Sequence, residues 1–205
     1  TPLGSGIGAT GVSRNSIAGP TTAGCALATA DAGASTTRPD MTFSQPVSPT
    51  TIAVVDGTTI TLPFGPLADV YFYASTGEIL GRLTNNTAHD YGCTEINIDR
   101  QGASSVQFWN TNTTNYLASK SFRVLPANNN PTGSYNITLY YTSAEVTGWQ
   151  TATGQIWTGG STKIVKVPNR INDITPASSP TGIEVNLGSV ASAFGSNYAI
   201  TATFT

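Results

Sequence analysis

The chain has 205 residues, a formal net charge of −2, and 9 Lys and Arg against 11 Asp and Glu. The basic residues are scattered between Arg14 and Arg170, whereas nucleic-acid binding by counterion release needs a cluster of them. This distribution argues against a nucleic-acid partner. No apolar run approaches the roughly 20 residues that a membrane-spanning helix needs, so we expect no transmembrane segment.

The composition predicts an all-β fold. Lys, Glu and Leu, which form helices well, are scarce, while the abundant Thr, Val, Ile and Tyr favour strands. The chain also has 21 Gly and 12 Pro, which supply turns between short strands. We therefore expect an antiparallel β-sandwich, immunoglobulin-like or jelly-roll-like, of about ten strands with one short helix.

Residues 1–40 differ from the rest of the chain. They are mainly Gly, Ala, Ser and Thr, with isolated aliphatic residues and no sustained period. This composition favours a flexible leader over an extended segment that is ordered by what it packs on. We therefore divide the chain into an N-terminal segment, 1–40, and a sandwich domain, 41–205, built as one unit or as two packed sub-domains.

From residue 41 onward, short β-type runs alternate with turn signals. The clearest hairpin joins 51–55 to 58–62 through Asp56-Gly57, a dipeptide that accepts the positive φ angles of a type I′ turn. Further strands are expected at 67–74, 78–84, 94–99, 105–109, 120–125, 134–142, 162–167, 182–187 and 197–204.

Two of these runs alternate as half-buried strands do. In the first, Tyr135, Ile137, Leu139 and Tyr141 should face the core, while Ser134, Asn136, Thr138 and Tyr140 should face water. In the second, the residues expected to face the core are Tyr198, Ile200, Ala202 and Phe204.

One short helix is expected after residue 142. Thr142-Ser143-Ala144-Glu145 has the spacing of a capping box, in which the threonine hydroxyl and the glutamate side chain each bind the other residue's backbone N–H. We expect the helix to end near Trp149, before a glycine-rich stretch.

The two cysteines, Cys25 and Cys93, are too far apart for a compact metal or redox motif, and two thiols cannot complete a structural zinc site. A disulfide between them is the favoured interpretation, and two buried free thiols are the alternative. The polar composition and weak core favour an oxidising setting. We therefore expect an extracellular or cell-surface protein.

Catalytic and metal-binding signals are weak. His89, the only histidine, stands beside Asp90 in an Asn-rich stretch, and no motif marks a nucleophile near it. We expect an ordinary loop histidine and no enzyme. Calcium is the one candidate cofactor, with weak oxygen ligands at Asn169, Asn172 and Asp173, although Asn and Asp also form turns by binding their own backbone.

The tryptophans are candidate ligand-binding residues. Trp149 and Trp157 flank a Gly- and Thr-rich segment, and with Trp109 they could supply flat apolar faces on which sugar rings stack. The alternative is that the rings fill the core, because a chain with so few leucines needs aromatic residues there. Exposure of the rings decides between the two interpretations.

Three stretches between Gly65 and Pro176 carry a resemblance: GPLADVYFYASTGEILGRLTNNTAHDYGCTEINIDRQG, FWNTNTTNYLASKSFRVLPANNNPTGSYNITLYYTSAEVTGW and TKIVKVPNRINDITP. This part of the chain resembles a β-sandwich accessory module of secreted, multidomain Bacteroidota proteins that are exported by the type IX secretion system. The resemblance implies surface attachment, adhesion or substrate targeting, and it implies no catalytic residues.

These observations lead to one functional expectation and two alternatives. The first is a non-catalytic extracellular module for adhesion that engages a polysaccharide or a cell-surface component. The second is a structural subunit of an extracellular, pilus-like filament, in which the N-terminal segment completes the sheet of an identical subunit by donor-strand addition. The third is an ancillary domain of a secreted hydrolase. The candidate donor residues are Leu3, Ile7, Val12 and Ile17.

Overall fold

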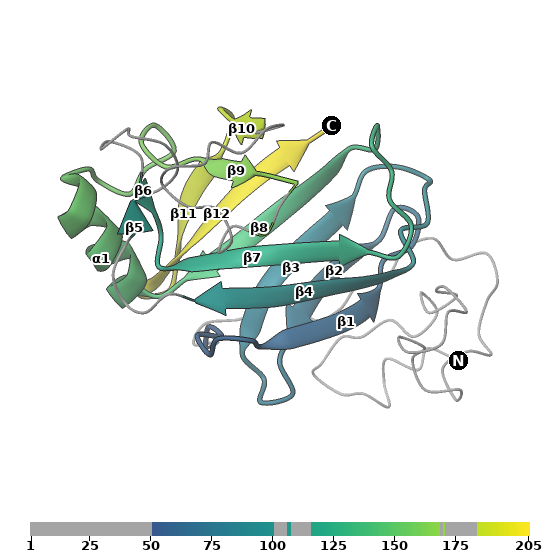
Figure 1. Cartoon of the computed structure of the whole chain (residues 1–205), viewed down its shortest axis with the longest axis horizontal. Helices are drawn as coiled ribbons and strands as arrows, with labels where there is room; N and C mark the ends of the chain where they lie inside the picture. Colours follow the sequence, from purple (N-terminus) through teal and green to yellow (C-terminus); the bar gives the residue numbers. More distant parts are fainter. Residues whose placement is uncertain (1–50, 101–105, 108–115, 169, 171–183) are drawn as a thin grey trace.

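A computed structural model describes residues 51–100, 106–107, 116–168, 170 and 184–205. It confirms an all-β antiparallel sandwich with one helix (Figure 1). One sheet has five strands in the order β11-β12-β8-β3-β2, and the other has three in the order β1-β4-β7. The bounds of these strands are β1 Thr59–Pro63, β2 Asp69–Tyr73, β3 Ile79–Asn85, β4 Cys93–Arg100, β7 Lys120–Pro126, β8 Tyr135–Tyr141, β11 Val190–Phe194 and β12 Asn197–Phe204.

Three smaller elements accompany the two sheets. Strands β5 (Val106–Gln107) and β6 (Tyr116–Leu117) form one short ladder, and β9 (Ile164–Lys166) and β10 (Glu184–Asn186) form another. Helix α1 (Ser143–Thr153) follows β8. Every strand pair in these sheets and ladders is antiparallel.

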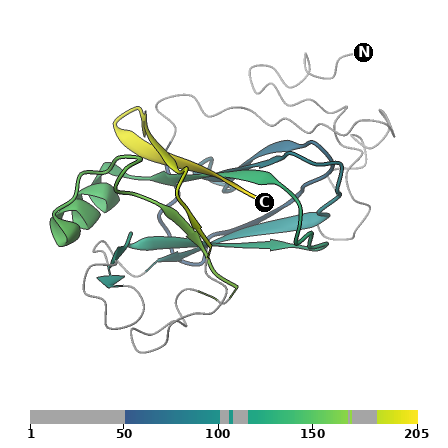
Figure 2. The same cartoon turned by 90° about the horizontal axis from the view of Figure 1, so that it is seen from above.

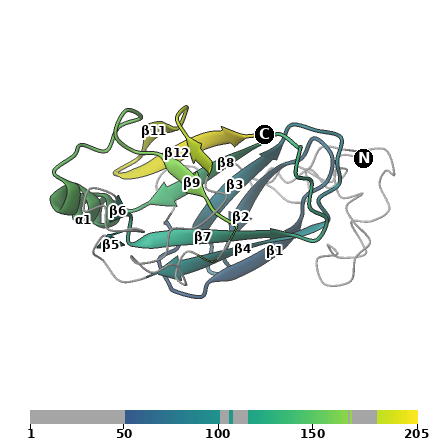
Figure 3. The ribbon, with the colours of Figure 1, turned by 45° about the horizontal axis from the view of Figure 1, so that its top comes forward.

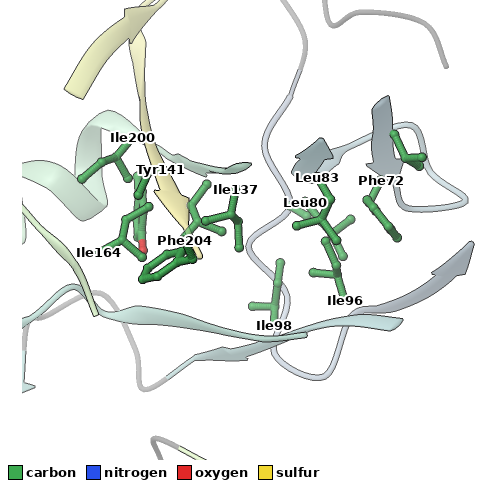
Figure 4. Packing of buried hydrophobic residues seen from close by; sticks show 14 of the residues in the cluster. Phe72, Leu80, Leu83, Ile96, Ile98, Ile137, Tyr141, Ile164, Ile200 and Phe204 are labelled. Carbon is green, nitrogen blue, oxygen red and sulfur yellow. The ribbon is translucent and has the colours of Figure 1, made fainter. Parts of the chain in front are cut away.

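The two sheets lie face to face and enclose the core (Figure 2). Phe72 and Leu83 of the large sheet point toward Ile96 and Ile98 of the small sheet (Figure 4). These four side chains are 0–1% exposed. Burying a side chain of this size stabilises the fold by about 1.5–3 kcal/mol, so the alternation of apolar residues determines which face of each strand turns inward.

The large sheet extends beyond the small one. Across the core, β1 of the small sheet faces β2 of the large sheet, β4 faces β3, and β7 faces β8. Strands β12 and β11 of the large sheet therefore have no facing strand of the small sheet. Aromatic rings and β9 cover their inner face instead. The rings of Trp149 and Trp157 meet edge to face with centroids 5.4 Å apart, and Trp157 also contacts Tyr141 and Tyr198.

The predicted hairpin between 51–55 and 58–62 is wrong. A turn forms at these residues, but it is not type I′, because Gly57 has a positive φ of 75° and Asp56 does not; β1 then pairs with β4 in the register Thr59↔Asn97. The Gly57 N–H donates to the carbonyl of Ile98 at 2.8 Å, so the turn joins the small sheet. The preceding residues cross to the large sheet, where Ile52 makes a parallel bridge to Ile79.

The alternation of β8 is confirmed on one face only. Ile137, Leu139 and Tyr141 lie in the core, as do Ile200 and its inward neighbours on β12. On the other face, however, Thr138 is 8% and Tyr140 4% exposed. The prediction that this face meets water is therefore wrong for both residues: the Tyr140 ring packs against Phe194, and the Thr138 hydroxyl is hydrogen-bonded to that of Thr201 at 2.8 Å.

Helix α1 begins as the capping box predicts. The Thr142 hydroxyl accepts the N–H of Glu145 at 3.2 Å, and the Glu145 carboxylate accepts the N–H of Thr142 at 2.8 Å. The helix runs to Thr153, beyond the expected end near Trp149, and Gly154 closes it in the left-handed conformation with φ 67°. Glycine suits this position because it has no Cβ to clash.

A buried ion pair joins this helix to β7. The Lys120 ammonium lies 3.2 Å from the Glu145 carboxylate, and both side chains are 0% exposed. The ammonium also donates to the carbonyl of Ala53 at 3.0 Å. It lies 5.5 Å from the ring centroid of Phe122 and 5.2 Å from that of Tyr141. Lys120 thus connects β7 of the small sheet to helix α1 and to Ala53.

Candidate functional site

The tryptophan platform is wrong for two of its three residues. Trp149 and Trp157 are each 7% exposed, and the Trp149 indole N–H donates to the carbonyl of Tyr116 at 3.3 Å. The rings cover the inner face of β12, so they offer no free face to a sugar. Trp109 lies outside the described residues.

Several predicted residues lie where the structure does not describe them. Cys25 is one, so its pairing with Cys93 remains a prediction, although Cys93 at the start of β4 carries no free thiol. Within the described part of the chain, no three His, Cys, Asp or Glu side chains gather as metal ligands would. The other predicted residues outside the described part are the calcium ligands Asn169, Asn172 and Asp173 and the donor residues Leu3, Ile7, Val12 and Ile17.

His89 has the contacts of a loop histidine. Its Nε2 lies 3.1 Å from the carbonyl oxygen of Asn128, and its ring meets Tyr91 edge to face at 4.7 Å. The neighbouring Asp90 carboxylate accepts the N–H of Gly92 at 2.9 Å. Each side chain therefore helps to hold the loop before β4.

The edges of the two sheets differ in how they are protected. An unpaired edge strand invites another strand, and proteins block such edges with charge, proline or a bulge. Pro63 ends β1, Arg123 and Pro126 lie on β7, and Asp69 and a bulge at Phe72/Tyr73 interrupt β2. Three of the four edges in the two main sheets thus carry a blocking feature.

The fourth edge, β11, carries none. Its sequence VASAF has no charged residue and no proline, and among the described strands only β12 pairs with it (Figure 3). Val190 at its start is 62% exposed, and the preceding turn and β10 expose Leu187 by 77% and Val185 by 44%. We call β11 together with Val185 and Leu187 the β11 edge. It combines an unpaired strand with exposed apolar side chains.

The hairpin geometry shows which backbone groups of β11 point outward. A two-residue turn with Gly195 at φ 61° joins Phe194 to Asn197, and the closing pair of such a hairpin is hydrogen-bonded. Hydrogen-bonded and non-bonded pairs then alternate. The N–H and C=O groups of Ala191 and Ala193 therefore point away from β12, toward an incoming strand.

The apolar end of the β11 edge is held in place by hydrogen bonds. The Lys163 ammonium donates to the carbonyl of Leu187 at 3.1 Å and to that of Gly159 at 2.7 Å. The Ser189 hydroxyl donates to the carbonyl of Asn186 at 2.7 Å and accepts the N–H of Ile164 at 3.0 Å. The exposed Leu187 is thus presented on an ordered turn, so docking a partner there orders little additional chain.

A second cluster lies on the outer face of the large sheet. It comprises Ile52, Tyr71, Tyr73, Ile79, Tyr140, Phe194 and Ala199, and we call it the tyrosine patch. The Tyr140 and Phe194 rings meet with centroids 5.0 Å apart. At its border, Arg82 makes two hydrogen bonds of 2.7 and 2.6 Å to Asp69, and its guanidinium lies 4.9 Å from the Tyr71 ring centroid.

The phenol groups of the tyrosine patch should lose their protons at a higher pH than free tyrosine does. Burial raises the pKa of Tyr73 to about 12 and also raises the pKa of Tyr71 and Tyr140. A phenol whose folded pKa exceeds its unfolded value near 10 stabilises the fold fully below about pH 10, and this stability is lost as the pH rises through the folded pKa. We expect tyrosinate absorbance to rise at higher pH in the native protein than in urea. Superimposed titration curves would contradict this expectation.

The β11 strand had no counterpart among the predicted strands. VASAF is short and rich in small residues, so its period-2 pattern is weak. The usable signal is Gly195-Ser196-Asn197, a turn directly before the predicted strand 197–204, which implies a preceding partner strand.

Comparisons with known proteins identify no relative: no family model, curated protein or solved structure matches the chain. The resemblance to secreted Bacteroidota modules therefore remains a prediction. The only helix among the described residues, α1, has 11 residues and is too short to cross a membrane.

Proposed function

We propose that this chain is a structural subunit of an extracellular filament, assembled by addition of a donor strand to the β11 edge. The donor is the N-terminal segment, residues 1–20, of an identical copy. The observation that carries this proposal is the β11 edge itself: β11 pairs with no described strand except β12, has no charged residue of its own, and is flanked by exposed apolar side chains.

The backbone of β11 suits strand addition. Its five residues span about 17 Å, and the outward N–H and C=O groups of Ala191 and Ala193 supply ladder bonds. Such bonds hold a partner, and side chains on alternate positions select it. A donor over Val190 or Leu187 would also remove exposed apolar surface from water, which favours association by about 25 cal/mol per Å².

The N-terminal segment has matching side chains. Leu3 and Ile7 are four residues apart, so in a strand they lie on the same face. Gly4, Ser5 and Gly6 between them offer little steric resistance to close pairing, and Pro2 stands before Leu3, at the start of such a strand, where proline is tolerated. The net charge of −2 for the whole chain also leaves identical copies with little mutual repulsion.

The β11 edge favours assembly over the other two functions. Carbohydrate engagement rested on Trp149 and Trp157, and both rings are buried. Adhesion at a cell surface is compatible with a filament, because a filament can present its subunits to a surface. Service as an ancillary domain of a hydrolase has no described feature in its favour.

Deletion of residues 1–20 tests the proposal. We expect the truncated chain to remain a folded monomer and to lose the ability to form filaments, as observed by negative-stain electron microscopy and sedimentation. A synthetic peptide of residues 1–20 should inhibit assembly of the full chain, and the same peptide with Leu3 and Ile7 replaced by Asp should not. Filaments from the truncated chain would refute the role of the donor.

A further inference from the structure

The exposed apolar side chains of the described residues gather around β11. Seven large ones are exposed, and four of these lie on β10, on β11, on the turn between them or on the loop after helix α1: Ile156, Val185, Leu187 and Val190. Ile156 and Leu187 are the most exposed, at 73% and 77%. A patch of exposed apolar side chains marks a site of interaction, so the loop after α1 bears on what β11 binds.

The loop of residues 156–161 runs along the inner side of β11, and the chain between α1 and β9 passes beside this strand (Figure 3). At one end of the loop, the Trp157 ring contacts Tyr198, which pairs with Ala193. Farther along, a Cβ added to Gly159 would lie 3.1 Å from the carbonyl oxygen of Ser189 and 3.7 Å from the Cα of Val190. Glycine permits this close approach of two backbones.

Hydrogen bonds hold the backbone around Ile156 in place although its side chain is exposed. The Trp157 N–H donates to the Gln150 side-chain oxygen at 3.0 Å, and the Ser161 hydroxyl donates to the Ile156 carbonyl. Lys163 fastens the loop to the turn before β11, because its ammonium binds the carbonyls of both Gly159 and Leu187. A partner that contacts Ile156 therefore meets an ordered loop, and little conformational freedom is lost on binding.

The inner side of β11 itself is lined by small side chains. Ala191 and Ala193 pair with Ile200 and Tyr198, which face the core, and residues paired across two strands share a face. A strand added to β11 would place its own inward side chains beyond these alanines, next to the 156–161 loop. We propose that Ile156 and Leu187 form a rim that selects the incoming strand by accepting large aliphatic side chains from its inward-facing positions.

This rim rests on the proposed function, and it adds what the incoming strand of a second copy must carry. Residues 156–161 and 185–194 include no charged side chain. A charged group on the incoming strand would lose its water here without gaining a partner of opposite charge. The rim therefore favours an uncharged strand with aliphatic residues on one face. The chain contains such a sequence, because residues 1–13 carry no charged side chain and include Leu3 and Ile7.

Assembly of the full chain tests the rim. We expect Ile156→Asp to raise the critical concentration for filament formation by about tenfold or more, because apolar burial is lost and a carboxylate is desolvated. Ile156→Leu keeps a large aliphatic side chain and should assemble as the parent chain does. Val55→Asp is the matched control, since it places the same charge on another exposed apolar residue, 61% exposed and located before β1.

The outcomes separate the rim from the proposed function. Thermal unfolding of the three variants should match that of the parent chain, because the replaced side chains are exposed. An Ile156→Asp chain that assembles as well as Val55→Asp would overturn the rim and leave β11 as the acceptor edge. A parent chain that forms no filaments would overturn the proposed function, and the rim would fall with it.

Photo-crosslinking supplies a second measurement on the full chain. A benzophenone amino acid replaces Ile156 in one variant and Val55 in another, and isotope-labelled and unlabelled chains are mixed before assembly. We expect the probe at Ile156 to crosslink differently labelled chains, at an aliphatic residue in an uncharged stretch, and the probe at Val55 to give few such products. Crosslinks from Ile156 that stay within one chain, or that reach a charged stretch, would contradict the rim.

Discussion

Replacing Lys120 with methionine is expected to destabilise the fold by about 3–5 kcal/mol. The substitution leaves the Glu145 carboxylate, 0% exposed, without its cation at 3.2 Å. It also removes the donor to the carbonyl of Ala53. An uncompensated buried charge is among the most costly changes in a protein interior, because desolvation is no longer offset by attraction.

Urea unfolding followed by tryptophan fluorescence measures this effect, because Trp149 and Trp157 lie in the same core. Glu145→Gln should be similarly destabilising, since it leaves the Lys120 ammonium buried without its anion. Lys163→Met is the control, because Lys163 is only partly buried and donates to backbone carbonyls alone. A Lys120→Met midpoint equal to that of the control would contradict the prediction.

A double variant distinguishes the interaction between Lys120 and Glu145 from the effect of burying any side chain at these two positions. Lys120→Met combined with Glu145→Leu removes both charges and leaves apolar side chains of similar size. Such replacements of buried ion pairs are often neutral or stabilising. We expect the double variant to regain most of the stability lost in either single variant. A purely additive loss would show that the two side chains act independently.

Replacing Ala193 with proline is expected to abolish filament formation while the monomer stays folded. The N–H of Ala193 points away from β12, so proline removes a bond to an incoming strand but none within the sheet. Ala193 is also exposed, so the ring has room. Sedimentation and negative-stain microscopy measure assembly, and thermal unfolding measures the monomer.

Ser192→Pro is the matched control for this experiment. Ser192 is bonded to Ala199 on β12 by the alternation of the hairpin, so proline there breaks the sheet itself. We expect Ser192→Pro to lower the melting temperature, and Ala193→Pro to lower it much less. Filaments of Ala193→Pro with normal appearance would exclude β11 as the acceptor edge, whatever the outcome for the N-terminal deletion.

The buried lysine and the open edge are related through the unequal sizes of the two sheets. Because the small sheet ends at β7, the helix and the tryptophans fill the space below β12, and Lys120 of β7 binds the helix there. The same inequality leaves β11 as the last strand of the large sheet. The arrangement that buries the predicted sugar platform therefore also produces the candidate assembly edge.

The local sequence determined much of the fold by itself. The period-2 runs of β8 and β12 identified their core-facing residues, because burial of alternate side chains is a property of a single strand. The capping box located the start of α1 to the residue, because all of its bonds lie within four positions. The composition alone indicated the all-β class.

Only the tertiary structure decided which segments are neighbours. The Asp56-Gly57 turn formed but did not make a hairpin, because β1 pairs with β4 and Ile52 pairs with Ile79 on the other sheet. Tryptophan exposure, the partner of Lys120 and the unprotected state of β11 depend on contacts between residues far apart in the chain. Periodicity and turn signals act over a few residues, and they carry no information about which layer will cover a given face.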